Sequence, residues 1–218
     1  MMPRYKAYKD SGIEWIGEIP EHWEAYRFSS VGHFFKGIGI KKDEVKSMGS
    51  PCIRYGEIYT AYDRIVYSPV SFISEETTIN LVKGIKGDIL IAGSGETIED
   101  IGRAILYYGE TTIYVGGDII VLRLRNIINA LFLSYVVNAP YVQYHKSLVG
   151  KGEIIVHIYA KDIKVIRFVL PPPEEQTQIV QYLDKKTSLI DELISLKERK
   201  IELLKEKRTA LINHVVTK

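Results

Sequence analysis

The segment EEQTQIVQYLDKKTSLIDELISLKERKIELLKEKRTALINHVV, residues 174–216, contains neither glycine nor proline. Pro171, Pro172 and Pro173 precede it, and because proline cannot continue a helix, they mark the start of a new element. Glu174 and Glu175 suit the positive N-terminal end of a helix. The segment therefore predicts one helix from about residue 174 to 216, roughly 65 Å long at ~1.5 Å per residue.

Apolar residues along this segment form two adjacent seams at spacings of three and four residues, with charged residues elsewhere. This wide stripe is typical of a coiled-coil arm that pairs with another helix. An arm that folds back on its own domain is the alternative. The candidate partner interface comprises Ile179, Leu183, Leu189, Ile190, Leu193, Leu196, Ile201, Leu204 and Leu211.

The chain before the three prolines has a different pattern, in which turns alternate with short apolar runs. These runs predict strands at 51–59, 87–93, 103–109, 117–125 and 162–171. Residues 128–148 predict a helix that Pro140 interrupts after Asn138. We therefore expect an α+β fold, with a β-rich domain at 1–170 followed by one long helix at 171–218.

Composition supports a folded protein without a membrane span. Hydrophobic residues make up 46% of the 218 residues, which is enough for a core. The N-terminus lacks the apolar stretch of a secretory signal, and Cys52 is the only cysteine, so we expect a cytoplasmic protein without disulfides. The single cysteine also lacks the neighbours that a zinc site needs.

The net charge of +2 is not that of a strongly basic nucleic-acid binder, but the lysines and arginines are unevenly distributed. Two locally basic segments, 36–54 and 145–167, could converge on one face and contact phosphates. The alternative is that both are solvated loops. Their basic residues are Lys36, Lys41, Lys42, Lys46 and Arg54, and Lys146, Lys151, Lys161, Lys164 and Arg167.

Motifs for catalysis are weak throughout the chain. The segment 88–97, DILIAGSGET, imitates a cofactor-binding glycine loop, but a strand-like run follows where a helix should begin. Asn138-Ala139-Pro140-Tyr141 resembles the Asn-Pro-Pro-Tyr motif of adenine methyltransferases, with alanine in place of a proline. No histidine has the spacing of a metal ligand. We expect no catalytic residues, no metal and no cofactor.

A series of sequence blocks resembles the specificity (S) subunits of type I restriction–modification systems. The opening block, SGIEWIGEIPEHWEAYRF (11–28), is similar to the start of those subunits. Further similar blocks follow in the same order. They are KGIGIKKDEV (36–45), IRYGEIY (53–59), GSGETIEDIGRAILY (93–107), GGDIIVLRL (116–124), VGKGEIIVHI (149–158) and LPPPEEQTQIVQYLD (170–184).

This resemblance implies a protein that supplies DNA sequence specificity and no catalysis. It implies double-stranded DNA, methyltransferase (M) subunits and, through the complex, restriction (R) subunits as partners. The usual subunit has two recognition domains and two long antiparallel helices, whereas this sequence has one of each. The chain is then a natural half-subunit or a truncated one. Two copies pairing their arms would supply the missing half and read a bipartite, palindromic site. Pairing with another S chain is the alternative.

The candidate DNA contacts divide into phosphate and base contacts. Arg54 and Arg103 could each make a bidentate contact to guanine, and glycines at 37, 39, 93 and 95 could let backbone approach the duplex. The full set comprises Lys36, Gly37, Lys41, Lys42, Arg54, Tyr55, Tyr59, Ser94, Thr97, Arg103, Lys146, Lys151 and His157.

Two other functions stay open at the level of sequence. One is a dimeric interaction or anti-restriction protein that docks methyltransferase subunits without reading DNA. The other is an orphan methyltransferase, which would bind a methyl donor. Salt-dependent, sequence-preferring binding to DNA distinguishes a specificity subunit from the first, and failure to bind a labelled methyl donor would exclude the second.

Overall fold

The computed structural model describes residues 5–125, 128–152 and 155–217, and its fold class is α+β, as expected. Residues 153–154 of the block at 149–158 lie outside the described residues. The chain divides into two compact units, Met1–Gln176 and Thr177–Lys218. Every described strand belongs to the first unit, whereas the second unit consists of the greater part of one helix.

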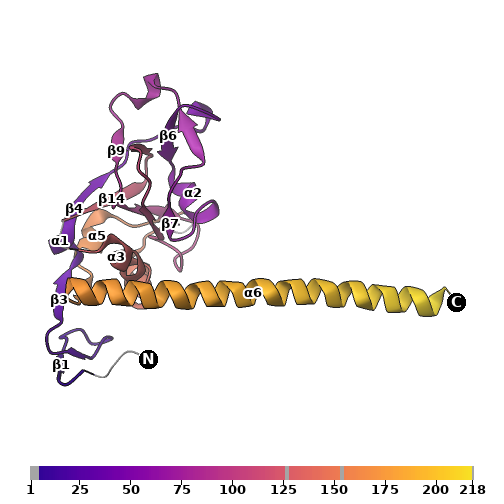
Figure 1. Ribbon diagram of the computed structural model, residues 1–218. Coiled ribbons are helices and arrows are strands. Elements are labelled where there is room, and N and C mark those ends of the chain that lie inside the picture. Colours follow the sequence, from indigo (N-terminus) through magenta and orange to yellow (C-terminus); the bar gives the residue numbers. More distant parts are fainter. Residues whose placement is uncertain (1–4, 126–127, 153–154, 218) are drawn as a thin grey trace. The chain divides into compact units, whose positions relative to one another are not determined.

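The first unit is built on two five-stranded sheets (Figure 1). One sheet is antiparallel except for the parallel pairing of β12 with β7. Its central strands confirm the predicted strands at 87–93, 103–109 and 117–125. In spatial order the sheet comprises β4 (Gly32–Lys36), β14 (Ile119–Leu124), β10 (Ile89–Ala92), β12 (Ala104–Tyr107) and β7 (Ile65–Val66).

The second sheet shares its core with the first. Ile53 and Val115 from this sheet belong to the same buried cluster as Leu90, Ile105 and Val121 from the other. Burial of apolar surface between the sheets therefore holds the unit together. In spatial order the second sheet comprises β5 (Val45–Lys46), β8 (Ser71–Ile73), β6 (Ser50–Ile53), β13 (Ile113–Val115) and β9 (Val82–Gly84).

Three antiparallel strand pairs complete the β structure. Two of them join segments that are far apart in the sequence, and one of these brings β3, near the start of the chain, beside the last strand. The pairs are β1 (Tyr8–Asp10) with β2 (Glu18–Pro20), β3 (Glu24–Arg27) with β16 (Arg167–Leu170), and β11 (Ser94–Gly95) with β15 (Val156–His157).

Two predicted strands are partly wrong, because each contains a helical turn with an acidic residue at its N-terminus. The predicted strand 51–59 ends at Ile53, and α2 (Tyr55–Thr60) follows. Glu57 accepts a hydrogen bond from the Arg54 amide at 3.1 Å. The predicted strand 162–171 likewise begins only after α5 (Ala160–Lys164). Such caps stabilise helical turns that apolar spacing alone does not reveal.

The predicted interruption at Pro140 is confirmed. Helix α3 (Ala130–Val137) ends just before it, and α4 (Pro140–Val149) begins with it, a position where the missing N–H has no helical partner to lose. The Asn129 side chain caps α3 by accepting from the amides of Leu131 and Phe132. The remaining short helices are α1 (Phe28–Val31) and the 3₁₀ turns η1 (Lys42–Glu44) and η2 (Glu76–Thr78).

A polar cluster ties the beginning of the chain to Glu175. This carboxylate accepts from Tyr5 Oη at 2.6 Å and Trp23 Nε1 at 2.9 Å, and it lies 2.5 Å from His22 Nε2. Burial opposes the charge, but these hydrogen bonds outweigh it and hold the pKa of Glu175 below its usual range. The sequence block at 11–28 therefore contacts Glu175, just after the three prolines, through His22 and Trp23.

The predicted long helix is confirmed as α6 (Pro173–Val216), which has 44 residues. Its length is about 66 Å at ~1.5 Å per residue. Seven of the nine candidate interface residues are exposed large hydrophobics, with Leu193 56% and Leu196 58% exposed. The other two, Ile179 and Leu183, lie in its first three turns. The apolar stripe thus remains largely open to solvent along the helix.

Candidate nucleic-acid interface

Three adjoining hollows that share lining residues open on the surface of the first unit. The first hollow, of about 480 Å³, shares Asp118 with the second, of about 520 Å³. The second shares Tyr55, Gly56 and Thr60 with the third, of about 450 Å³. We call the residues that line these hollows the concave face. It draws on β4, α2, the loop after β11, the start of β14 and the segment from β15 into α5.

Most of the candidate DNA-binding residues lie on this face. It brings together side chains that are up to about 120 residues apart in the sequence, from Lys36 to His157. Gly39, Gly93 and Gly95 also line it. The candidates found there are Lys36, Lys42, Arg54, Tyr55, Tyr59, Thr97, Arg103 and His157.

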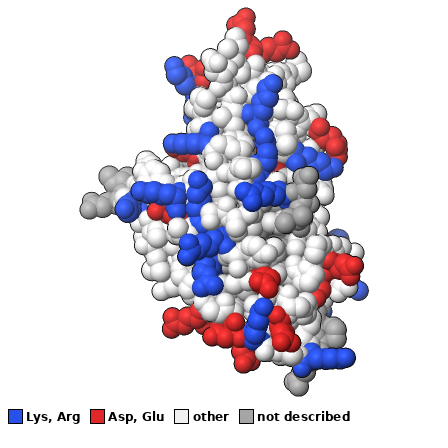
Figure 2. Space-filling model, turned by 90° about the vertical axis from the view of Figure 1, so that its left-hand side faces the viewer, with Lys and Arg blue, Asp and Glu red and all other residues white. Residues whose placement is uncertain are grey.

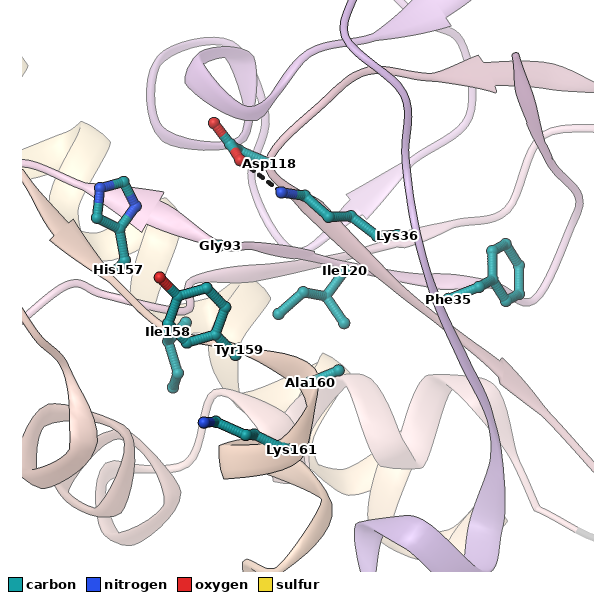
Figure 3. Close-up of a pocket in the computed structure, with 10 residues that line it drawn as sticks. All are labelled: Phe35, Lys36, Gly93, Asp118, Ile120, His157, Ile158, Tyr159, Ala160 and Lys161. Atoms are coloured by element: carbon teal, nitrogen blue, oxygen red, sulfur yellow. Dashed lines mark ion pairs between the residues drawn. The ribbon is translucent and has the colours of Figure 1, made fainter. Parts of the chain in front are cut away.

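The first hollow joins the two basic segments of the sequence, since Lys36 and Lys161 both line it (Figure 3). Lys36 Nζ lies 3.0 Å from Asp118 Oδ1, and both side chains are substantially exposed. In Figure 3, His157, Tyr159 and Lys161 lie on the other side of the hollow, with Gly93 and Ile120 between. The hollow thus combines cations at its rim with an apolar, aromatic wall.

His157 is held in place by its neighbours on both sides. Its Nδ1 lies 2.9 Å from the buried Ser94 Oγ, and its backbone exchanges two hydrogen bonds with Lys151. Lys151 is exposed beside it, and Lys41 is exposed beside Lys42. Ser94 is only 2% exposed, so its hydroxyl orients the histidine and does not form part of the surface.

Both candidate arginines are engaged within the protein. Arg54 Nη2 and Nε lie 2.7 and 2.8 Å from Glu57 Oε1, and the Glu57 side chain is 9% exposed. Arg103 donates through Nη2 to the Tyr62 carbonyl at 3.1 Å. A bidentate contact to guanine by either side chain therefore requires it to exchange an internal partner for the base.

Tyr59 has a structural role on the same face. Its hydroxyl donates to the Ser94 carbonyl at 3.1 Å. Burial, with a smaller contribution from Asp100, raises the pKa of Tyr59 to about 12. The hydroxyl therefore stays protonated and joins α2 to β11.

Two of the glycines have a role in internal packing. A Cβ at Gly37 would lie 2.0 Å from the Gly116 carbonyl oxygen. A Cβ at Gly95 would lie 2.8 Å from Tyr59 Oη. Close approach within the protein explains glycine at these positions.

Lys146 is the clearest correction to the candidate set. Its side chain is fully buried, and Nζ donates to the Gly102 carbonyl at 2.6 Å. A side chain so placed does not reach a phosphate at the surface. Lys146 lies on the buried side of α4. The sequence did not reveal this, because apolar and polar residues are mixed along the segment.

Three polar side chains of the first hollow were absent from the candidate set: Asp118, Tyr159 and Lys161. Asp118 adopts a φ of 58°, which is uncommon for a residue other than glycine. The preceding Gly116-Gly117 pair signals a turn there. Tyr159 and Lys161 follow His157 closely in the sequence, and only the turn into α5 brings them to the hollow.

Charge on the surface is concentrated rather than uniform. Figure 2 views the molecule from the side on which β4, α1 and α5 lie in Figure 1. Lysine and arginine side chains gather across the middle of this view, and aspartate and glutamate lie mainly toward its ends. A basic region bordered by acidic groups favours the approach of a polyanion to one area.

The described residues contain no candidate metal cluster, no membrane-spanning helix and no helix-opening glycine loop after β10. They contain no group of three or more His, Cys, Asp or Glu side chains arranged to hold a metal ion. None of the helices formed by these residues is long and apolar enough to cross a bilayer. The glycine loop after β10 leads into β11 and not into a helix, unlike a cofactor-binding loop.

Comparison with known proteins agrees with the architecture. A family model described as the type I restriction modification DNA specificity domain matches residues 20–206. The chain is 26% identical over 221 residues to the MjaX type I restriction enzyme specificity subunit of Methanocaldococcus jannaschii, covering 98% of this chain and 46% of that protein. It is 25% identical over 232 residues to the MjaVIII specificity subunit of the same organism, covering 98% and 49%.

The fold has a counterpart among solved structures. The HsdS subunit from Thermoanaerobacter tengcongensis aligns with a TM-score of 0.60 at 20% identity, over 84% of this chain and 41% of that one. The chain spans about half the length of the curated relatives it matches. Since the family model covers most of the chain, the chain belongs to the type I restriction–modification DNA specificity family.

Proposed function

We propose that this chain recognises a DNA target for a type I restriction–modification complex, and that methylation and cleavage are carried out by partner subunits. The observation that carries the proposal is the convergence of both basic segments on the concave face, where Lys36 and Lys161 line one hollow. Cations at the rim contact phosphates, and the polar and aromatic side chains between them contact base edges.

The test compares salt dependence in two double variants with equal net charge. Lys36→Glu/Lys42→Glu removes two candidate phosphate contacts on the concave face. Lys6→Glu/Lys83→Glu makes the same charge change at exposed positions outside the three hollows. The slope of log K against log salt is negative, and each lost phosphate contact reduces its magnitude by ~0.9. The magnitude should therefore fall by about 2 in the first variant and change little in the control.

The binding partner in this assay is a duplex selected from a random library, measured by fluorescence anisotropy with and without methyltransferase subunits. Equal slopes for the two variants would place the phosphate contacts elsewhere. Binding without any sequence preference in either condition would favour the alternative function, a protein that docks methyltransferase subunits without reading DNA.

We also propose that α6 pairs antiparallel with a second copy of itself. Its charges are divided along its length. Residues 173–196 carry five acidic and two basic side chains, whereas residues 197–217 carry three acidic and six basic ones. Antiparallel pairing places the acidic half of one helix beside the basic half of the other, and parallel pairing does not. The exposed apolar stripe would be buried in this pair.

A further inference from the structure

Two side chains of α4 hold the back of the loop that follows β11. Gln143 Nε2 donates to the carbonyls of Glu99, at 2.8 Å, and Ile101, at 2.7 Å. Lys146 Nζ donates to the carbonyl of Gly102 at 2.6 Å. Three carbonyls within four residues are thus bound by one helix.

The lysine of this arrangement is unusual in its surroundings. It is fully buried, and its partners are neutral: the Gly102 carbonyl and, at 3.4 Å, Gln143 Oε1. Burying an ammonium group is unfavourable unless it is well bound, so the position is not explained by solvation or by a surface ion pair. Burial lowers the pKa of Lys146 to about 7.

The loop is shaped to accept this side chain. Gly102 has a φ of +75°, and a Cβ there would lie 2.8 Å from Lys146 Cδ. The stem of the lysine therefore passes directly over Gly102. The absence of a side chain at this residue allows α4 and the loop to approach each other closely.

The opposite side of the same loop lines the third hollow, through Thr97, Asp100 and Arg103. Thr97 Oγ1 and Asp100 Oδ2 lie 3.3 Å apart, and Arg103 reaches back to the Tyr62 carbonyl. The residues that face the hollow are thus carried on backbone whose carbonyls are fixed from behind by α4.

We propose that Gln143 and Lys146 are positioning residues for base recognition, which hold the 96–103 loop so that Thr97 and Arg103 meet the DNA in a defined orientation. The inference rests on the proposed function of the concave face. A rigid loop discriminates between bases because a wrong base pair cannot be accommodated by a small shift of the backbone.

The sharpest test is Gln143→Glu in the full chain. Glutamate has the same shape but cannot donate to the two carbonyls, and its carboxylate would lie beside Lys146 Nζ, so the helix keeps a favourable contact. Ser147→Ala is the matched control, because the Ser147 hydroxyl on the same helix donates to the Tyr144 carbonyl in an exposed hydrogen bond within that helix. Lys146→Met is a second variant that keeps the stem and removes the ammonium.

Two readouts apply to each variant. Hydrogen exchange of the amides from 97 to 103 should accelerate by about tenfold or more in Gln143→Glu and Lys146→Met, and not in Ser147→Ala. In selection from a random duplex library with methyltransferase subunits present, discrimination should fall by about tenfold at the base pairs read by the loop and by less than about twofold elsewhere. A merely structural role would lower the folded fraction without changing base preference.

The outcomes separate this inference from the function on which it rests. If the wild-type chain selects a motif and both variants retain full discrimination at every position, the positioning role is overturned and DNA recognition stands. Unchanged exchange in the loop would overturn it independently of any DNA measurement. If the wild-type chain selects no motif, DNA recognition is overturned, and the positioning role with it.

Discussion

At the scale of single residues, the interaction partners of the basic side chains are what the sequence did not predict. Lys36 and Lys146 both belong to basic segments, yet one lies at a rim beside Asp118 and the other is buried against a carbonyl. Arg54 lies on the concave face as expected, but Glu57 holds its guanidinium. A DNA contact by Arg54 thus competes with an internal ion pair, whereas one by Lys36 competes with an exposed pair, which contributes little.

Lys146 provides a prediction about stability and pH. Its pKa is about 7 in the folded protein and 10.5 ordinarily, so between these values the unfolded chain binds a proton that the folded chain lacks. Protonation then favours unfolding, and stability should rise as pH rises through this window, by at most ~1.4 kcal/mol per pH unit. Lys146→Met should lack this contribution. Urea unfolding of both proteins at pH 7, 8 and 9 measures it.

The comparison between the two proteins is necessary because other groups oppose the trend. Burial raises the pKa of Cys52 to about 11, so its contribution to stability falls above the usual pKa of a thiol. This contribution is common to both proteins and cancels in their difference. Parallel pH profiles for wild type and Lys146→Met would show that Lys146 titrates normally in the folded state.

At the scale of elements, α6 has the periodicity of a helix that packs against another helix, and the structure leaves its apolar stripe exposed. An isolated helix of this length exposing a wide apolar stripe is a strong driver of association. The division of charge along α6 adds a preference for the antiparallel orientation. Partner choice by α6 therefore depends on two separate features, one apolar and one electrostatic.

Substitution of the stripe tests this element directly. Changing Leu193, Leu196, Ile201 and Leu204 to Lys should convert a dimer of about twice 24.9 kDa into a folded monomer, because burying four ammonium groups is prohibitive. Light scattering at micromolar concentration gives the mass, and circular dichroism checks the fold. The matched control changes Ser188, Ser195, Thr209 and Asn213 to Lys, which adds equal charge outside both apolar seams.

A wild-type monomer in this experiment would argue against self-pairing. The stripe would then be the docking site for a methyltransferase subunit or a second specificity chain. Dissociation of the control variant to the same extent would mean that added charge alone, and not loss of the apolar stripe, separates the copies.

At the scale of the whole molecule, symmetry constrains the DNA target. A pair of identical chains related by a two-fold axis presents two identical recognition faces in inverted orientation. Each face can read the same short sequence on opposite strands. The target of such a pair is therefore a palindrome with a fixed gap, whatever bases each half contains.

Methylation mapping tests the symmetry. With this chain as the only specificity polypeptide, the modified sites should consist of two inverted copies of one half-site at constant spacing. The change of one base pair in either half should reduce modification equally, each costing about 1–3 kcal/mol. Two unrelated half-sites under these conditions would exclude the symmetric pair, while leaving DNA recognition by the concave face in place.

Sequence alone determined the features that depend on neighbouring residues. The helix after Pro173, its apolar seams, the central strands β10, β12 and β14, and the break at Pro140 follow from periodicity and from the geometry of proline. The ordered blocks also pointed to the specificity family. These signals are local, so each can be recognised within a short window of residues.

Tertiary structure alone decided which side chains reach the concave face and with which partners. Burial of Lys146 over Gly102, the pairing of Arg54 with Glu57, and the meeting of Lys36 with Lys161 depend on how sheets and helices pack. Spacing in the sequence carries little information about contacts between residues far apart in it. The fold was therefore largely predictable, whereas the arrangement of its recognition surface required three dimensions.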